Sequence, residues 1–224
     1  PLETLSPTTG DPTLGRMHSN QAALGLDLLL AQRWELGAEA WGRSLRDSVV
    51  TDVGVAPEAV DGWASGLEFT SRYRLREVFF SWVSLTVARA EREDAPFDYD
   101  QPYAFNFVAS YDPRPGWNVG FRFRAASGLP YTPVASSIYD GTTDSYTAVP
   151  GEVNSARLPD YKKVDIHLER AVSFPRWTLS MYSETWWVLP GGNVLYPAYS
   201  FDYSEQGFVA GPSFLPLVGL RAEL

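Results

Sequence analysis

Apolar and polar residues alternate along most of this chain with a period of two. The clearest example lies within residues 156–172, where Val164, Ile166 and Leu168 alternate with Asp165 and His167. This period is typical of a β-strand with one apolar and one polar face. Comparable runs cover residues 22–32, 34–44, 66–75, 78–93, 103–111, 117–128, 176–188, 193–203 and 217–224. The pattern predicts an all-β, antiparallel fold of about ten strands.

Alternation by itself fits two architectures, a soluble β-sandwich or barrel and a transmembrane β-barrel. Most of the runs are about 9 to 13 residues long, whereas strands of soluble proteins average about 5 to 6 and a tilted membrane-crossing strand needs about 9 to 11. Aromatic residues lie at or near the predicted strand ends, where an interfacial girdle is found in membrane barrels. These are Trp34, Trp63, Tyr103, Tyr111, Trp117, Tyr161, Trp177, Trp186 and Trp187. We therefore predict one transmembrane β-barrel domain over residues 1–224, in the outer membrane of a Gram-negative bacterium and in contact with its lipid.

Each strand then has a side that faces lipid and a side that faces a wet interior. The apolar positions predicted to face lipid are Leu24, Leu26, Leu28, Phe105, Phe107, Phe121, Val164, Ile166 and Leu168. The polar positions predicted to face the lumen are Glu35, Glu39, Glu68, Arg72, Arg122, Arg124, Asp165 and His167.

Composition narrows the functions that this barrel could have. The 224 residues include no cysteine, which excludes disulfides, thiolate catalysis and cysteine-ligated metals. There are 27 acidic and 18 basic residues, and a net charge of −9 argues against a nucleic-acid partner. No apolar stretch approaches the roughly 20 residues of a membrane helix. We expect neither a cofactor nor a resident metal ion.

Several motifs, taken in order, resemble those of one family. They are "GDPTLGRMHSNQAALGLD" with Gly10, Asp11, Pro12, Leu14, Ser19, Asn20, Leu24 and Gly25, "GWASGLEF" with Gly66, Leu67 and Glu68, "FDYDQPYAFNFVASYDPRPGWNVGFRFRAASGLPYTPV", "ARLPDYKKVDIHLER" with Leu158, Pro159, Tyr161 and Asp165, and "GLRAEL". This succession resembles the C-terminal part of the barrel of TonB-dependent outer-membrane transporters. Two departures are Leu224, where the family usually has an aromatic residue, and "WWVLPGGNV", where it has an Asn-rich turn matched here by Asn193.

The resemblance implies active uptake of a scarce ligand, either a small molecule or a peptide, through a barrel of about 22 strands filled by an N-terminal plug. The plug and the N-terminal strands are absent from this sequence. Ten strands would either close on themselves into a narrow barrel or be completed by other protein chains or missing strands, because a lipid bilayer does not tolerate open sheet edges.

Candidate chemistry is sparse, and we expect no enzymatic activity. His167, between Asp165 and Glu169, could begin an acid–base site, although a charge ladder in the lumen explains it more simply. An acidic run could supply calcium ligands but lacks the spacing of a calcium loop, which favours a solvated loop; it comprises Glu91, Glu93, Asp94, Asp98 and Asp100. Arg122 and Arg124, with Arg72 and Arg74, either attract anionic solutes or pair with interior glutamates.

A long connection at residues 128–160, rich in Pro, Gly, Ser, Thr and Asp, is expected to be either functional, folding inward or contacting a ligand, or disordered. With ten strands and a periplasmic C-terminus, this connection and those near 50–60 and 91–102 fall on the periplasmic side. That placement conflicts with the short periplasmic turns of outer-membrane barrels, so the sequence leaves the orientation open. The principal functional hypothesis is uptake or passage of a solute. The alternatives are a small plugless barrel that serves as a structural subunit of an envelope complex and, less favoured, an outer-membrane hydrolase.

Overall fold

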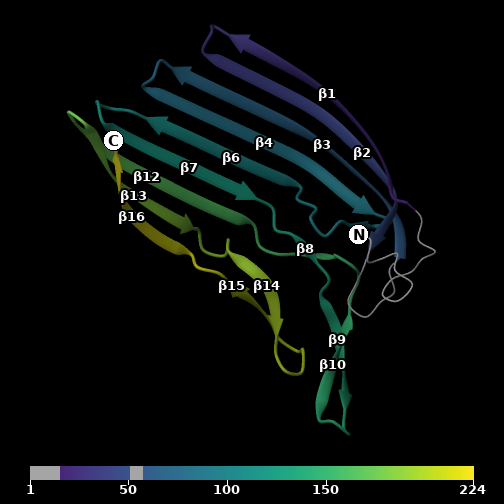
Figure 1. Cartoon of the computed structure of the whole chain (residues 1–224). Helices are drawn as coiled ribbons and strands as arrows, with labels where there is room; N and C mark the ends of the chain where they lie inside the picture. Colours follow the sequence, from purple (N-terminus) through teal and green to yellow (C-terminus); the bar gives the residue numbers. More distant parts are fainter. Residues whose placement is uncertain (1–15, 51–57) are drawn as a thin grey trace.

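The computed structural model describes residues 16–50 and 58–224. It is built around one curved antiparallel sheet (Figure 1). The sheet has the strand order β1-β2-β3-β4-β6-β7-β12-β13-β16, and the two-residue strand β5 (Ala95–Pro96) is added beside β4. The nine long strands are β1 (His18–Leu30), β2 (Trp34–Val50), β3 (Glu58–Leu75), β4 (Phe79–Arg92), β6 (Tyr103–Tyr111), β7 (Trp117–Ala126), β12 (Tyr161–Phe174), β13 (Trp177–Val188) and β16 (Phe214–Glu223).

The prediction of an all-β antiparallel fold of about ten long strands is confirmed. The nine strands range from 9 residues in β6 to 18 in β3, so each reaches the length that a tilted membrane crossing requires. Among the residues that the structure describes, no helix is long and apolar enough to cross a membrane. The resemblance residues Gly10, Asp11, Pro12 and Leu14 lie outside the described residues.

One predicted strand was wrong. Residues 193–203 do not join the large sheet; they contribute β14 (Val194–Tyr199), which forms a separate hairpin with β15 (Gln206–Ala210). The apolar and aromatic residues of this segment give it the sequence pattern of a membrane-crossing strand. However, β14 is only six residues long, contains Pro197 and has a register shift between Val194 and Tyr196, so it is too short to cross the bilayer.

The connection at residues 128–160 also contains strands. β8 (Pro130–Tyr131) pairs with β11 (Ala156–Arg157) at its base, and β9 (Val134–Asp140) pairs with β10 (Ser145–Pro150) in a hairpin that projects beyond the sheet (Figure 1). The β14–β15 hairpin lies beside it. Two long connections therefore meet at the same end of the molecule. The assignment of residues 1–224 to a single domain stays a prediction.

Moving β14 out of the sheet changes the sidedness of every connection. Residues 31–33, 76–78, 112–116 and 175–176 now form short turns at one end of the sheet. The long connections at 93–102, 127–160 and 189–213 lie at the other end. Glu223 is paired with Thr178, so the C-terminus lies at the short-turn end. A periplasmic C-terminus thus agrees with short periplasmic turns, and the conflict raised by the sequence disappears because residues 193–203 do not form a strand of the large sheet.

The sheet is not closed in this structure. In the described part of the chain, β1 pairs only with β2 and β16 pairs only with β13, so each outermost strand has one unpaired edge. Self-closure, one of the two predicted possibilities, is therefore not what the structure shows. Open edges cannot remain in hydrocarbon, because each unpaired backbone group costs several kcal/mol there, on the order of 2–7.

Burial in the described residues differs from that of a soluble β-sandwich. The apolar residues found buried in the described chain are few, namely Val60, Ala125, Ala126 and Val188. Large apolar side chains on one face of the sheet are exposed instead, for example Leu24 at 81% and Leu220 at 73%. A soluble sheet would cover such a face with a second layer. Lipid is the solvent that suits an uncovered apolar face.

Candidate functional site

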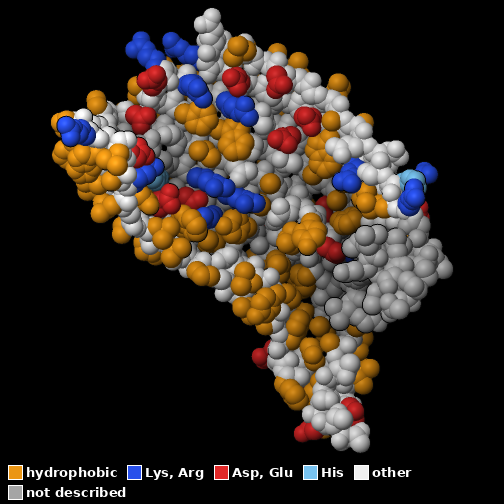
Figure 2. Space-filling model, viewed as in Figure 1, with side chains coloured by type: hydrophobic (Ala, Val, Ile, Leu, Met, Phe, Trp, Pro, Cys, Tyr) orange, Lys and Arg blue, Asp and Glu red, His pale blue; other side chains and the backbone are white. Residues whose placement is uncertain are grey.

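The candidate site is the concave face of the sheet, which carries most of its charged side chains. Figure 2 shows Lys, Arg, Asp and Glu gathered on the face turned toward the viewer. Strand register places Glu35 opposite Arg72, and Arg122 opposite Asp165. Glu39 lies opposite Glu68, Arg124 opposite Lys163, and His167 opposite Gly120. All eight residues predicted to face the lumen therefore share one face of the sheet.

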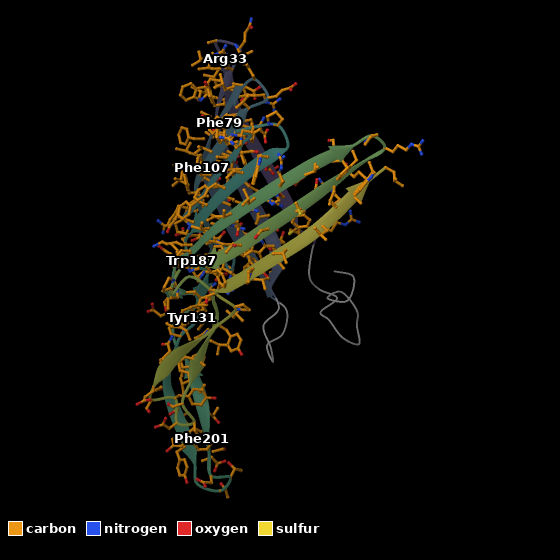
Figure 3. The ribbon with its side chains drawn as sticks, turned by 90° about the vertical axis from the view of Figure 1, so that its left-hand side faces the viewer. Arg33, Phe79, Phe107, Tyr131, Trp187 and Phe201 are labelled. Carbon is orange, nitrogen blue, oxygen red and sulfur yellow. The ribbon has the colours of Figure 1, made fainter. Side chains whose placement is uncertain are left out.

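The residues predicted to face lipid share the opposite, convex face. Phe105 and Phe107 on β6 pack against Phe123 and Phe121 on β7 with tilted rings, whose centroids lie 6.0 and 5.8 Å apart. Register continues this layer through Ile166 opposite Phe121. Figure 3 views the sheet along its edge, with the labelled Phe79 and Phe107 on the convex side. The remaining members of the predicted set are Leu24, Leu26 and Leu28 on β1, and Val164 and Leu168 on β12. The register separates the two predicted sets; which medium each face contacts stays a prediction.

Aromatic side chains gather toward both ends of this convex face. At the short-turn end, Trp34 packs edge-on against Tyr73 at 5.7 Å and Phe174 stacks on Trp177 at 4.4 Å. At the other end, Trp187 lies opposite Phe214. Among the residues predicted as girdle members, Trp186 and Tyr161 differ, because register places them on the concave face beside Asp165 and Ala126.

Charges on the concave face are partly paired. Arg72 lies 3.6 Å from Glu35, and Lys163 lies 2.9 Å from Asp165 and 4.2 Å from the centre of the Trp186 ring. Within the described residues, no ion pair joins Arg122 to a carboxylate, although Asp165 is its register partner. Arg72 thus pairs with a glutamate of the concave face, as one of the two predictions for the arginines expects, while attraction of an anionic solute by Arg122 stays a prediction.

His167 lies between two carboxylates. Its Nδ1 is 3.2 Å from Glu184 and its Nε2 is 3.5 Å from Glu169, while Arg221 donates to Glu169 at 3.2 Å. The Tyr182 ring stacks beside the imidazole with centroids 6.2 Å apart. No hydroxyl forms a hydrogen bond with His167 in the part of the chain that the structure describes, and its polar contacts form a charge ladder on the concave face.

Three members of this ladder were not predicted from the sequence: Glu184, Arg221 and Tyr182. Alternation in the segment 176–188 could have indicated Glu184, but Trp186 lies on the same face and obscures the pattern. Beside the ladder is an open hollow of about 360 Å³. Its lining includes Val108, Ser110, Arg122, Lys163, His167 and Trp186. The hollow offers a cation, an aromatic ring and a hydroxyl to a solute, and no set of metal ligands occurs among the described residues.

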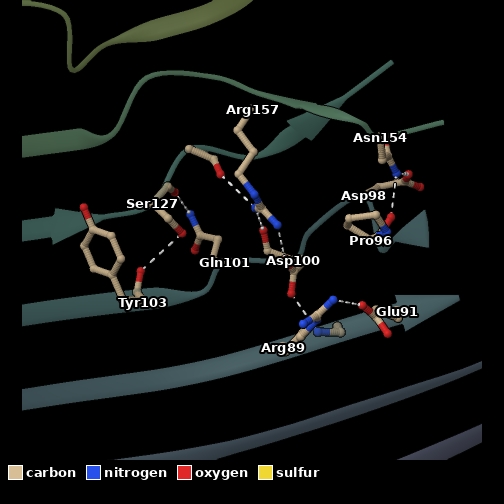
Figure 4. Close-up of polar contacts among 12 residues, drawn as sticks. Arg89, Glu91, Pro96, Asp98, Asp100, Gln101, Tyr103, Ser127, Asn154 and Arg157 are labelled. Carbon is tan, nitrogen blue, oxygen red and sulfur yellow. Dashed lines mark hydrogen bonds and ion pairs between the residues drawn. The ribbon is translucent and has the colours of Figure 1, made fainter. Parts of the chain in front are cut away.

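A second polar cluster fixes the long connections to the sheet (Figure 4). Asp100 is 4% exposed; it accepts a hydrogen bond from the Ala90 amide at 2.6 Å and forms an ion pair with Arg157. Arg157 also donates to the Asp100 carbonyl at 2.8 Å and to the Gly128 carbonyl at 3.3 Å. This Asp100–Arg157 clasp joins the connection 93–102 to the connection 127–160.

The acidic run is therefore not simply a solvated loop. Asp98 lies 3.4 Å from Arg92 and accepts from the buried Asn154 at 2.7 Å, and Glu91 pairs with Arg89. These carboxylates and Asp100 have Arg or Asn partners, which the spacing of the run could not reveal because Asn154 and Arg157 are far away in sequence.

The sequence matches one known protein family. A model of the family described as "TonB dependent receptor-like, beta-barrel" matches residues 2–183. The chain belongs to this family. Its location is accordingly the bacterial outer membrane, as predicted. No curated protein matches the chain significantly.

A solved receptor structure agrees with the family in fold. The ferric-catecholate import receptor Fiu of Escherichia coli K12, in a closed form, is similar with a TM-score of 0.56 at 14% identity, over 92% of this chain and 28% of the Fiu chain. OmpT, an outer-membrane protein of Vibrio cholerae, gives a TM-score of 0.44 at 11% identity, over 91% of this chain and 55% of its own. The chain thus spans little more than a quarter of the length of Fiu, and the resemblance to part of a receptor barrel is confirmed.

Proposed function

We propose that this chain forms part of the wall of an outer-membrane uptake receptor. Its concave face lines a water-filled passage for a solute and its convex face contacts lipid. The observation that carries the proposal is the strand register, which puts Arg122, Asp165 and His167 on one face and Phe121, Ile166 and Leu168 on the other. Membership of the receptor-barrel family supports the same assignment.

Further strands complete the barrel in this proposal. The unpaired edges of β1 and β16 are the places where they join, because closure is the only way in which such a sheet avoids open edges in lipid. Whether these strands come from the same polypeptide or from partner chains, their backbone must pair with β1 and β16. The short turns face the periplasm and the long connections face the outside of the cell.

The absence of cysteine from the sequence makes a labelling test direct, because each introduced thiol is unique. Asp165→Cys and His167→Cys are expected to react with a water-soluble maleimide in outer-membrane vesicles. Ile166→Cys and Leu168→Cys are expected to resist it and to react with a lipid-soluble maleimide. Equal reactivity of neighbouring positions would contradict a wall between water and lipid.

The same reagents test orientation. In intact cells, an impermeant maleimide should label Thr142→Cys in the β9–β10 hairpin and should not label Arg176→Cys in the turn between β12 and β13. The reverse result would invert the proposed sidedness. Folded protein should also migrate on gels in a heat-modifiable manner. A chain that remains soluble without detergent would rule out the membrane assignment.

A further inference from the structure

The β9–β10 and β14–β15 hairpins form one projecting unit, residues 134–150 and 194–210, which we call the hairpin pair. The rings of Tyr146 and Phe201 meet edge to face with centroids 5.6 Å apart. The Ser137 hydroxyl donates to the Asp202 carbonyl at 2.7 Å, and the Val134 amide donates to the Tyr199 hydroxyl at 3.1 Å. These contacts join segments that are about 65 residues apart in sequence. Figure 3 shows the unit extending beyond the sheet, with Phe201 near its tip.

Large apolar side chains are exposed on the hairpin pair. They include Ile138, Tyr139, Leu195, Tyr196 and Phe208, and Phe201 is 72% exposed. Lipid contact does not explain them, because both hairpins lie beyond the end of the membrane-length strands. Contiguous exposed apolar surface outside the membrane is characteristic of a binding surface.

The charge of the hairpin pair has a single sign. Its two segments contain four carboxylates, Asp140, Asp144, Asp202 and Glu205, and no Lys, Arg or His. Figure 2 shows acidic and apolar side chains on the projection. Hydrogen bonds from Ser200 and Ser204 lower the pKa of Asp202 to about 2, and hydrogen bonds from Thr142 lower the pKa of Asp140. Both carboxylates are therefore ionised at every pH that a bacterium normally meets.

The hairpin pair also has open strand edges. β10 pairs only with β9 in the described chain, and β14 and β15 pair only with each other. Ser137 on β9 and Tyr146 on β10 both contact the second hairpin, so it packs against one face of the first hairpin, and among the described residues the outer edge of β10 has no strand partner. An extended peptide adds to such an edge through main-chain hydrogen bonds.

We propose that the hairpin pair binds an extended basic peptide. The peptide pairs its main chain with β10, places Lys or Arg side chains against the four carboxylates, and packs its apolar side chains on the exposed rings. Tyrosine faces strengthen the binding of cations through cation–π contacts. A compact organic cation would use the charge but not the strand edge. The proposal rests on the proposed function only in placing these connections outside the cell.

The experiment measures peptide affinity for the detergent-solubilised protein. The probes are a ten-residue peptide that alternates Lys with Val, its Glu–Val counterpart, a Lys–Val counterpart in which every backbone amide is N-methylated, and spermine. Only the unmodified Lys–Val peptide is expected to bind well, and its affinity should fall as salt rises. Equal binding of the Glu–Val or the N-methylated peptide would overturn the proposal. Full competition by spermine would indicate a site for small cations instead and would also overturn it.

Matched variants locate the site. Asp144→Asn with Glu205→Gln removes two charges from the hairpin pair and should weaken binding of the Lys–Val peptide about tenfold. The control, Asp112→Asn with Glu77→Gln, makes the same chemical changes at the short-turn end and should bind like the unchanged protein. Heat-modifiable migration verifies that both variants are folded. Equal affinity of the two variants would refute the site, while the cysteine-labelling result for the barrel wall would stand unaffected.

Discussion

Arg122 on β7 and Asp165 on β12 are direct register partners, yet the Asp165 carboxylate pairs with Lys163 on its own strand, at 2.9 Å. Arg124, two residues from Arg122 on the same face, is in turn the register partner of Lys163. Two neighbouring arginines on the same face of β7 thus have register partners of opposite charge. Reversing the charge of each arginine should therefore change the stability of the protein in opposite directions.

Arg122→Glu and Arg124→Glu are expected to differ in stability. The first variant places a carboxylate opposite Asp165, and the second places one opposite Lys163. Like charges that face each other across two strands destabilise and opposite charges stabilise, so Arg122→Glu should be the less stable variant by about 0.5–1 kcal/mol. Urea unfolding of the protein in lipid vesicles measures this difference. Equal unfolding midpoints would show that charged register partners on this face do not interact measurably.

Ile166 and His167 are adjacent residues on opposite faces, which allows the same substitution to be compared at both. Ile166→Lys should destabilise the protein by about 2–4 kcal/mol if the convex face contacts lipid near the bilayer midplane. His167→Lys keeps a polar side chain beside Glu184 and Glu169 and should change stability by less than about 1 kcal/mol. The unfolding free energy in vesicles is the measurement. A tolerated Ile166→Lys would argue against lipid on that face.

Asp100 and Asp98 belong to the same acidic run but differ in burial. Asp100→Ala removes the carboxylate that pairs with the Arg157 guanidinium and accepts from the Ala90 amide, and should cost about 3 kcal/mol, with faster hydrogen exchange at Ala90. Asp98→Ala should cost less than about 1 kcal/mol, because its carboxylate is half exposed and Asn154 keeps its bond to the Pro96 carbonyl. Similar losses for both variants would contradict a buried clasp.

The turn of the β14–β15 hairpin should become less stable in acid, as Asp202 is protonated. The folded pKa of Asp202, about 2, is below its ordinary value of 3.8, so its hydrogen bonds stabilise the turn fully above pH 3.8 and are lost as the pH falls through about 2. The protection factor of the Ser204 amide, which donates to Asp202, should fall over this interval after the intrinsic pH dependence of amide exchange is divided out. Asp202→Asn cannot titrate and should keep a constant protection factor over the same interval. A fall that persists in that variant would assign it to another group.

The alternation of residues determined much of this protein. It located all nine long strands, and it sorted the predicted lumen and lipid sets onto opposite faces, because side chains of a strand alternate whatever its partners are. It failed at residues 193–203, where local alternation is the same in a short hairpin as in a membrane strand. That single misassignment also reversed the apparent sidedness of the loops.

Contacts between residues distant in sequence could not be inferred in this way. The Asp100–Arg157 clasp spans 57 residues and the Ser137–Asp202 contact spans 65. Such pairs depend on which connections meet at one end of the sheet, and no local period encodes this. The sequence by itself determined the strands, their two faces and the family; only the tertiary structure decided which strand pairs with which, that the sheet is open at β1 and β16, and where the long connections converge. The reason is physical: alternation reflects the environment on either side of one strand, whereas register and convergence depend on the backbone hydrogen bonds between strands.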